Sequence, residues 1–460
     1  MDGIFSSLMR EKEVQAQDDK EAKEVHETRA LQRVEFGSAL PFAEPPSLQG
    51  FNSPYYAAAH LAWRKRCRAF VEEHLEPHAA EWDEAGALPP GLRRRMYKAG
   101  MLAVIWPTQY GGTPPAGSEH GSEHGSAWHG AWQGTRVDPF FDLIHMDELA
   151  RCASGGALAN LFSFGIGLPP ILLFGGAGMA ERVARPVITG EATMCLCVTE
   201  PAGGSDVARI ATTALRSADG SHFVVNGTKK WITGGSHADF FTVLCRTDGA
   251  QQGAAGLSML LLEKGMPGIS CRRMRTQGWW ASSTAFVEFD NVRVPAANLI
   301  GAEGQGFAYT MLNFNHERFM LSVQMNRFSR VCLEEAVGFA RRRRTFGKRL
   351  ADHQVIRHKV AEMARRVEGS HALLESYCYQ VRTGLPDAKL YGFMAWLKVQ
   401  CSRTMEFCAR EASQILGGAS FTRDGVGQKV ERIYREVRVM AIGGGSEEVM
   451  LNLAMSHAKL

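Results

Sequence analysis

The sequence lacks a large excess of either charge. Its 460 residues include 52 lysines and arginines against 48 aspartates and glutamates, a net charge of +4. This balance excludes a general electrostatic attraction to nucleic acid or to anionic membranes. No internal repeat is visible, and 45% hydrophobic with 22% charged residues excludes collagen-like, disordered and disulfide-scaffold proteins. The length predicts about three domains.

Paired cysteine motifs and membrane-spanning runs are also missing. None of the ten cysteines has the C-x-x-C spacing of a zinc ribbon, and no secretory signal is visible, so we expect reduced, mostly buried thiols. Residues 155–180 carry no charge but contain seven glycines and the pair Pro169-Pro170, which would break a spanning helix. We therefore predict two short buried segments joined by a bend, and no membrane span.

Both ends of the sequence carry signals. Residues 1–36 mix acids and bases densely, which is unlike a mitochondrial transit peptide and predicts a solvated helix or frayed extension. The last residues, Ala458-Lys459-Leu460, are a close variant of the Ser-Lys-Leu peroxisomal signal. They predict a peroxisome or a related organelle such as the glycosome. The cytoplasm and the mitochondrion are the alternatives.

The periodicity predicts a mostly α protein with a β middle domain. Strand patterns are confined to the region of about 190–297, and one of them, His222–Gly227, ends in an Asn-Gly hairpin signal. The low-complexity stretch 111–132 predicts a solvated loop, and we do not expect its His120, His124 and His129 to bind a metal. Helices are predicted over 55–101, 140–173, 307–342, 354–383, 387–414 and 449–457. The predicted parts are an extension (1–50), a helical domain (51–190), a β domain (191–300) and a helical bundle (301–460).

Five segments in a fixed order resemble the acyl-CoA dehydrogenase flavoprotein family. They are CVTEPAGGSD at 197–206, NGTKKWIT at 226–233, FDNVRVP at 289–295 with NLIG at 298–301, RRTFGK at 343–348 with Gln354, and QILGG at 414–418 followed by YRE at 434–436 and the 443–448 turn. The resemblance implies a helical N-terminal domain, a β-barrel-like middle domain and a C-terminal four-helix bundle. It also implies FAD, an acyl-CoA substrate oxidised to the trans-2-enoyl-CoA in fatty acid β-oxidation, a homotetramer or dimer, and electron-transfer flavoprotein or another electron acceptor.

The resemblance assigns the cofactor contacts. Thr199 is the chief hydrogen-bonding residue for the isoalloxazine ring, Trp231 covers one flank, and Arg343 contacts the FAD pyrophosphate of a neighbouring subunit. A bidentate guanidinium suits phosphate oxygens. The full predicted set is Leu196, Val198, Thr199, Ser205, Trp231, Ile232, Thr233, Arg343, Thr345, Phe346, Gln354, Gln414, Gly417, Gly418, Ser446 and Glu448.

The catalytic base departs from the most common pattern. Many family members carry it as a glutamate at the position held here by Gly444. Isovaleryl-CoA and long-chain acyl-CoA dehydrogenases instead use a Glu-Arg pair on a long helix, which matches Glu317-Arg318. We therefore predict Glu317 as the base, with Arg318 orienting the site and Glu447 and Glu448 as weaker rivals. The predicted substrate-binding residues are Ser205, Asn315, Arg318 and Gly445.

Substrate and alternative functions follow from the same residues. Gly443 and Gly444 predict extra room near the reacting carbons, suited to branched acyl groups, and residues 162–174 form either an acyl tunnel or a plain core helix pair. The alternatives are an acyl-CoA oxidase, another flavin oxidase or N-hydroxylase of the same fold, and a DNA-binding adaptive-response-like flavoprotein supported only by the basic run 341–349. The aspartate of nitroalkane oxidases would occupy position 444, so the glycine there opposes that chemistry.

Overall fold

The computed structural model describes residues 36–119, 137–249 and 253–458. The chain divides into two units, Met1–Pro54 and Tyr55–Leu460. In the first unit, Pro46–Leu48 forms a turn of 3₁₀ helix, and the Ser38 backbone N–H donates to Glu44 Oε1 at 3.0 Å. Residues 1–35 of the predicted extension, and His120, His124 and His129, lie outside the described residues.

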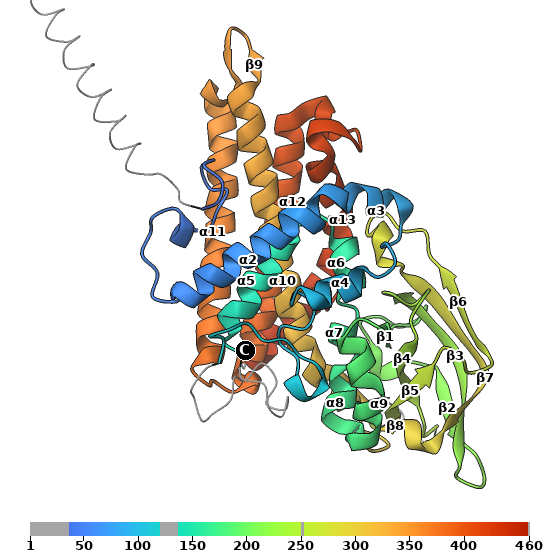
Figure 1. Ribbon diagram of the computed structural model, residues 1–460. Helices are drawn as coiled ribbons and strands as arrows, with labels where there is room; N and C mark the ends of the chain where they lie inside the picture. Colours follow the sequence, from blue (N-terminus) through green and yellow to red (C-terminus); the bar gives the residue numbers. More distant parts are fainter. Residues whose placement is uncertain (1–35, 120–136, 250–252, 459–460) are drawn as a thin grey trace, which may run out of the picture. The chain divides into compact units, whose positions relative to one another are not determined.

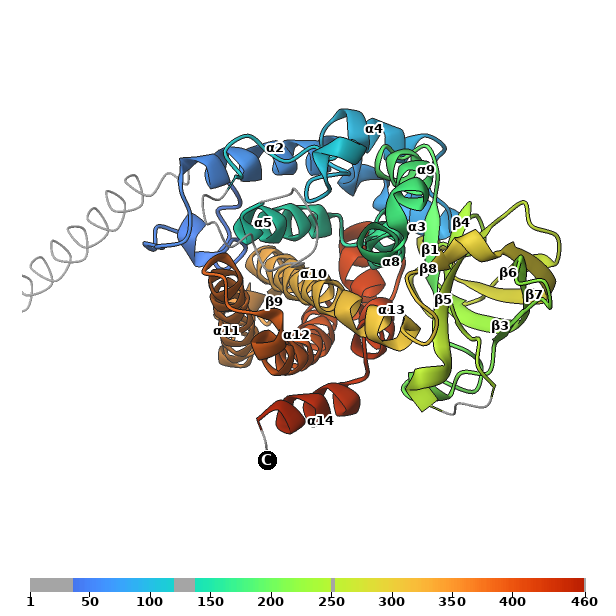
Figure 2. The same cartoon turned by 90° about the horizontal axis from the view of Figure 1, so that it is seen from below.

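Helices form the first part of the second unit. Helix α5 is buried along its length and begins at Asp138, whose carboxylate caps it by accepting from the Phe140 N–H at 3.0 Å, with Pro139 in the first helical position. Helix α2 packs on α5 (Figures 1 and 2), and the Trp63 indole N–H donates to Phe141 O at 3.1 Å. The helices are α2 (Ala58–His74), α3 (Ala79–Ala85), α4 (Leu92–Lys98), α5 (Pro139–Leu149), α6 (Gly155–Leu161), α7 (Phe164–Gly167), α8 (Pro169–Phe174) and α9 (Gly176–Ile188).

The uncharged stretch is broken as predicted. Helices α6, α7 and α8 are short and largely buried, and Pro169 and Pro170 stand in the first turn of α8. Within the described ranges, no single helix is long and apolar enough to cross a membrane. One pair, Gly155–Leu161 with Phe164–Phe174, meets that test by length and composition, but it is bent by 50°.

Residues 194–300 form one eight-stranded sheet. The order is β6-β7-β3-β2-β4-β5-β8, and β1 pairs in parallel with β4. The strands are β1 (Met194–Cys197), β2 (Thr213–Arg216), β3 (His222–Ile232), β4 (Phe240–Arg246), β5 (Leu257–Glu263), β6 (Ile269–Arg273), β7 (Ala285–Pro295) and β8 (Leu299–Ile300).

The predicted hairpin turn at Asn226-Gly227 was wrong. Strand β3 continues through both residues to Ile232, and its pairing with β7 shifts register between Val225 and Gly227. Gly227 has φ +144°, and a Cβ there would lie 2.7 Å from Thr212 Cα, so the glycine serves a bulge and a close backbone approach. The β2–β3 turn lies earlier, at Gly220, whose N–H donates to Ser217 O at 2.9 Å.

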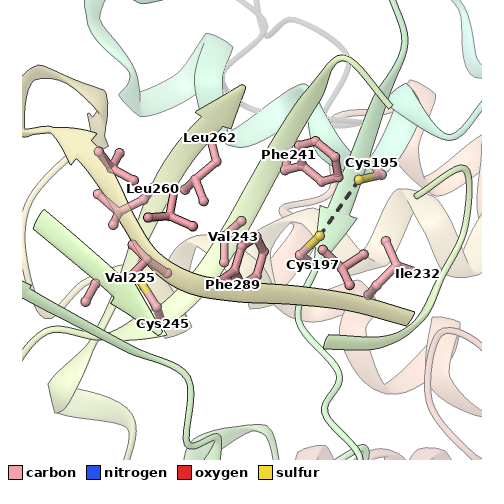
Figure 3. Packing of buried hydrophobic residues seen from close by; sticks show 14 of the residues in the cluster. Cys195, Cys197, Val225, Ile232, Phe241, Val243, Cys245, Leu260, Leu262 and Phe289 are labelled. Atoms are coloured by element: carbon pink, nitrogen blue, oxygen red, sulfur yellow. Dashed lines mark hydrogen bonds between the residues drawn. The ribbon is translucent and has the colours of Figure 1, made fainter. Parts of the chain in front are cut away.

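The core of the sheet is closely packed (Figure 3). Phe241, Val243 and Leu260 are almost completely buried in one cluster with the two cysteines of β1, whose sulfurs lie 3.8 Å apart. Cys195 and Cys197 share one face of β1 because side chains alternate along a strand. All ten cysteines are free thiols, and nine are buried, as predicted; Cys271 is exposed.

The C-terminal part is a bundle of long helices. They are α10 (Gly306–Arg342), α11 (Gln354–Arg382), α12 (Asp387–Leu416), α13 (Gln428–Ile442) and α14 (Glu447–His457), and the strands β9 (Arg344–Thr345) and β10 (Lys348–Arg349) form a small hairpin after α10. Helix α13 was not predicted as a helix, although its segment was singled out for the YRE motif. The helical and β parts agree with the predicted fold class.

A buried ionic network joins this bundle to the first helices. Arg327 on α10 donates to Asp147 Oδ2 on α5 at 2.5 Å, and Arg64 on α2 reaches Asp147 Oδ2 at 2.6 Å and Glu148 Oε1 at 2.5 Å. Each of these side chains is at most 4% exposed. Since an unpaired buried charge is costly, the network fixes α10 against α5 and so shapes the cavity between them.

Candidate active site

A cavity with about 800 Å³ of empty space, partly open to solvent, lies between α5, α6, α7 and α10. Glu317, Met320, Leu321 and Gln324 of α10 line it, and their spacing of 0, 3, 4 and 7 residues places them on one helix face. Thr233, directly after β3, lines the same cavity. The structure therefore brings the predicted base and one predicted cofactor residue to one site. The mainly apolar remainder of the lining includes Leu102 and Trp106 from the loop after α4, Leu158 of α6, and Phe162, which follows α6.

Glu317 has the properties of a general base. Burial raises the pKa of its carboxyl to about 7, although Arg318, Lys398 and His316 act in the opposite direction. Its Oε2 is shielded from solvent and has no hydrogen-bond partner among the described residues. A carboxyl that titrates near neutral pH and has an oxygen to spare can accept a proton from a substrate in the cavity.

Arg318 ties α10 to the turn at 443–446. Its Nε donates to Gly444 O at 2.9 Å, and its guanidinium reaches Asn315 Oδ1 at 3.5 Å. Burial lowers the pKa of Arg318. Asn315 is buried, and its Nδ2 has no partner in the described part of the chain. Arg318 and Asn315 therefore support the site beside Glu317.

Gly444 cannot simply be replaced by the more usual glutamate. Its φ is +70°, a conformation that favours glycine, and a Cβ there would lie 3.0 Å from Leu321 Cδ1 and 3.6 Å from Arg318 Cγ. Leu321 and Arg318 thus occupy much of the space that the glycine was expected to leave open. The structure therefore does not leave the extra room at Gly444 that the sequence predicted.

Lys398 was missed in the sequence. It is fully buried on α12, and its Nζ donates to Ala441 O at 2.6 Å and Gly445 O at 2.9 Å. Burial lowers the pKa of Lys398 to about 8. The sequence did carry a signal for the burial of this lysine, because Lys398 falls four residues after Met394 in the buried stripe of α12.

The rival carboxylates lie elsewhere. Glu447 accepts from Ser402 Oγ at 2.5 Å and from Arg403 Nε at 3.0 Å, so both of its oxygens are bonded to α12. Glu448 is exposed in the first turn of α14, and Ser446 precedes that helix. Neither glutamate lines the cavity that contains Glu317.

A buried ion pair stabilises the loop after β1. Lys229 Nζ donates to Glu200 Oε1 at 2.8 Å and to Val198 O at 3.0 Å, and the Lys230 N–H donates to Thr199 O at 2.9 Å. Glu200 also accepts from the backbone N–H groups of residues 211 and 212. Leu196, Val198 and Ile232 are buried, Thr199 is half-buried and Ser205 is exposed.

The end of β3 fits a planar ring. Trp231 is 50% exposed despite its size and has φ +60°, which an L-residue adopts at a cost. Lys230 Nζ lies 4.6 Å from the centroid of its indole. The exposed indole is two residues before Thr233, which lines the cavity, and it lies on the strand that bonds Thr199. This position fits the predicted contact of Trp231 with one side of a flavin ring.

Seven further predicted cofactor residues lie at the far end of the bundle, whereas Ser446 and Glu448 stand at the start of α14. From Glu317 to Arg342, α10 rises by about 38 Å. Arg343, Thr345 and Phe346 follow there in the β9–β10 hairpin (Figure 1), and Phe346 is 97% exposed. Lys359 of α11 pairs with Glu411 of α12, so Gln354 lies at the same end as the exposed Gln414, Gly417 and Gly418. One subunit therefore holds two separate groups of predicted cofactor residues.

The chain matches three family models. Residues 57–121 match "Acyl-CoA dehydrogenase, N-terminal domain", residues 195–292 match the middle domain and residues 304–458 match the C-terminal domain. "Acyl-CoA dehydrogenase apdG" of Emericella nidulans is 39% identical, covering 91% of this chain and 95% of that protein. Mitochondrial isobutyryl-CoA dehydrogenase of Bos taurus is 30% identical, covering 83% and 84%. A crystal structure of a probable acyl-CoA dehydrogenase from Mycobacterium abscessus is 33% identical with a TM-score of 0.78, covering 88% of this chain and all of that one.

Proposed function

Since this chain belongs to the acyl-CoA dehydrogenase family of FAD-dependent oxidoreductases, we propose that it oxidises a saturated acyl-CoA to the trans-2-enoyl-CoA with Glu317 as the base. The observation that carries the proposal is the Glu317 carboxyl, which lines a mainly apolar cavity, has a pKa raised by burial to about 7, and has no partner for Oε2 among the described residues.

In this mechanism Glu317 removes the α-proton. Its raised pKa makes it a stronger base than an exposed glutamate, and the apolar lining keeps water from the developing negative charge. Arg318, bonded to Gly444 O, keeps the 443–446 turn against α10. When bound, FAD supplies the acceptor for the β-hydride. Thr199, Trp231 and Thr233 would hold its ring.

Anaerobic flavin reduction tests the proposal directly. The holoenzyme, mixed without oxygen with acyl-CoAs of graded length and branching, is expected to lose its flavin absorbance with at least one of them. Failure of every acyl-CoA to bleach the flavin would contradict the proposal.

We further propose that the substrate is branched at the α-carbon. Support comes from the names of relatives: isobutyryl-CoA dehydrogenase at 30% identity and a cyclohexane-1-carbonyl-CoA dehydrogenase of Syntrophus aciditrophicus at 28%, both named for α-branched acyl groups. We expect kcat/KM to be higher for 2-methyl acyl-CoAs than for straight chains of equal length. Rejection of every branched chain would refute this.

We also propose an electron acceptor and an oligomeric state for this protein. Family members act as oligomers and use electron-transfer flavoprotein, and we propose the same acceptor and a homotetramer or dimer in which Arg343 contacts the FAD pyrophosphate of the neighbouring subunit. The distance of the hairpin from Glu317 supports that arrangement. An acyl-CoA oxidase is the second candidate, favoured by the peroxisome-like tail. Peroxide formed stoichiometrically in air would establish it.

The tail supports a proposed peroxisomal or related location. Ala458 is exposed after α14, which suits receptor access, and Lys459 and Leu460 lie outside the described residues. Deleting the three residues from an N-terminally tagged protein should disperse its fluorescence. Unchanged punctate import would refute the signal.

A further inference from the structure

Three buried polar side chains interrupt the mainly apolar lining of the cavity. Gln324 lies two helical turns along α10, about 10.5 Å from Glu317, on the same face. Across the cavity, α5 contributes Asp142 and His145, which are also three residues apart on one face. His145 and Asp142 are bonded within the protein, so Gln324 is the one of these three with an unpaired atom in the described part of the chain.

The buried amide oxygen of Gln324 lacks a partner in the part of the chain that the structure describes. The residue is only 7% exposed, and its Oε1 has no hydrogen-bond partner among the described residues. An unpaired buried amide costs stability, so its retention at a cavity wall points to a ligand that completes it. Because the atom without a partner is the amide oxygen, which is an acceptor, the ligand group that completes it must be a donor.

The opposite wall presents acceptors. His145 Nε2 lies 3.0 Å from Met101 O, so this nitrogen carries the proton, and burial lowers the pKa of His145 to about 4. The ring is therefore neutral, and its Nδ1 is an acceptor. Asp142 accepts from His316 Nε2 at 2.8 Å, and both side chains are buried. A carboxylate on the ligand would be repelled by Asp142 and Glu317.

We propose that the acyl group bears a hydroxyl on its distal part, which donates to the Oε1 of Gln324 in the wall of the cavity. A hydroxyl fits because its O–H can donate to the Oε1 of Gln324, the atom that has no partner among the described residues. The inference rests on the proposed dehydrogenase function and adds the chemical class of its substrate.

Paired substrates test the inference. Anaerobic flavin reduction is measured with acyl-CoAs of equal length, plain or hydroxylated at successive carbons beyond the β-carbon. We expect kcat/KM for one hydroxylated member to exceed that of its plain partner about tenfold or more, since a site built for a hydroxyl discriminates against its absence. Plain chains reacting as well as or better than every hydroxylated partner would overturn it.

Two variants localise the effect. Gln324→Met, of similar length but apolar, should leave the flavin spectrum unchanged and bring the ratio of kcat/KM between each hydroxylated acyl-CoA and its plain partner to about one. Gln400→Met is the matched control, because that amide bonds Ser370 and Thr404 away from the cavity. A preference that survives Gln324→Met would overturn the assignment, and the wild-type comparison still decides if the variant does not fold. Failure of all acyl-CoAs would instead refute the dehydrogenase function itself.

Discussion

At the residue scale, the site depends on the environment of one carboxyl. Glu447 directly follows the 443–446 turn, and Glu317 is next to Arg318, which bonds Gly444 O of that turn. Ser402 and Arg403, however, donate to both oxygens of Glu447. Glu317 has an oxygen without a partner in the described residues and faces the cavity. The difference in bonding, rather than residue type, separates a base from a structural acid.

Replacing Glu317 should therefore remove catalysis and keep the fold. For Glu317→Gln we expect kcat to fall by about 10²–10⁴-fold, because proton abstraction loses its base. Stopped-flow flavin reduction measures it, and an unchanged flavin spectrum confirms cofactor binding. Glu447→Gln is the matched control and should retain most of the turnover; the opposite pattern would transfer the role to Glu447.

The pH profile tests the same group. The pKa of Glu317 is raised to about 7, and only its ionised form can take a proton. In the free enzyme, kcat/KM should therefore be low at pH 5, rise through about pH 7 and level off above it. A profile that is flat between pH 5 and 9 would show that a carboxyl of ordinary pKa, or no carboxyl, controls the reaction.

At the scale of elements, Lys398 is a link between α12 and the turn that follows α13. Its ammonium satisfies the Ala441 and Gly445 carbonyls, and its charge opposes the rise in the Glu317 pKa. A buried cation is costly unless its hydrogen bonds are complete, so this residue holds the turn in place next to Arg318.

Lys398→Met should lower the free energy of unfolding by about 3 kcal/mol, because two buried carbonyls lose a charged donor. The midpoint of the kcat/KM profile should also move to higher pH, since a cation near Glu317 is gone. Urea denaturation and the pH series measure the two effects. Lys389→Met, an exposed position on α12, is the control. An unchanged midpoint would remove Lys398 from the electrostatics of the site.

Helices and most strands could be predicted because their apolar periodicity reflects one buried face. The Asn226-Gly227 turn could not, since the same dipeptide serves a bulge when Thr212 approaches the backbone. Lys398 was missed because a lysine in an apolar stripe reads as a surface residue until the carbonyls it bonds are known. The Leu321 contact at Gly444 likewise depends on how α10 meets a turn 120 residues away.

At the scale of the whole molecule, the predicted FAD-binding residues of one chain fall into two groups that lie far apart. Thr233 lines the Glu317 cavity, and Thr199 and Trp231 lie on or next to the strand that leads to it. Arg343 follows the end of α10, about 38 Å along the helix axis from Glu317. A hairpin that exposes Phe346 almost completely, beside a run of arginines, carries apolar and cationic surface suited to a neighbouring subunit. We expect each complete site to use the cavity of one subunit and the hairpin of another.

Subunit mixing tests this arrangement. Glu317→Gln removes the base of a subunit's own cavity, and Arg343→Ala should remove the pyrophosphate contact that it offers to its neighbour, so each variant alone should be nearly inactive. In a mixed assembly, the intact Glu317 of one variant meets the intact Arg343 of the other. Random pairing in symmetric dimers would then restore about a quarter of wild-type activity per subunit.

The control is mixing Glu317→Gln with a subunit carrying both substitutions. That mixture contains no intact Glu317, so it should stay inactive at every ratio, whereas co-expression of the two single variants should give activity that depends on their ratio. If Arg343→Ala subunits are fully active alone, the hairpin makes no contact that FAD needs. If they are inactive and mixing restores no activity, Arg343 acts within its own subunit. The neighbouring subunit then does not supply the pyrophosphate contact.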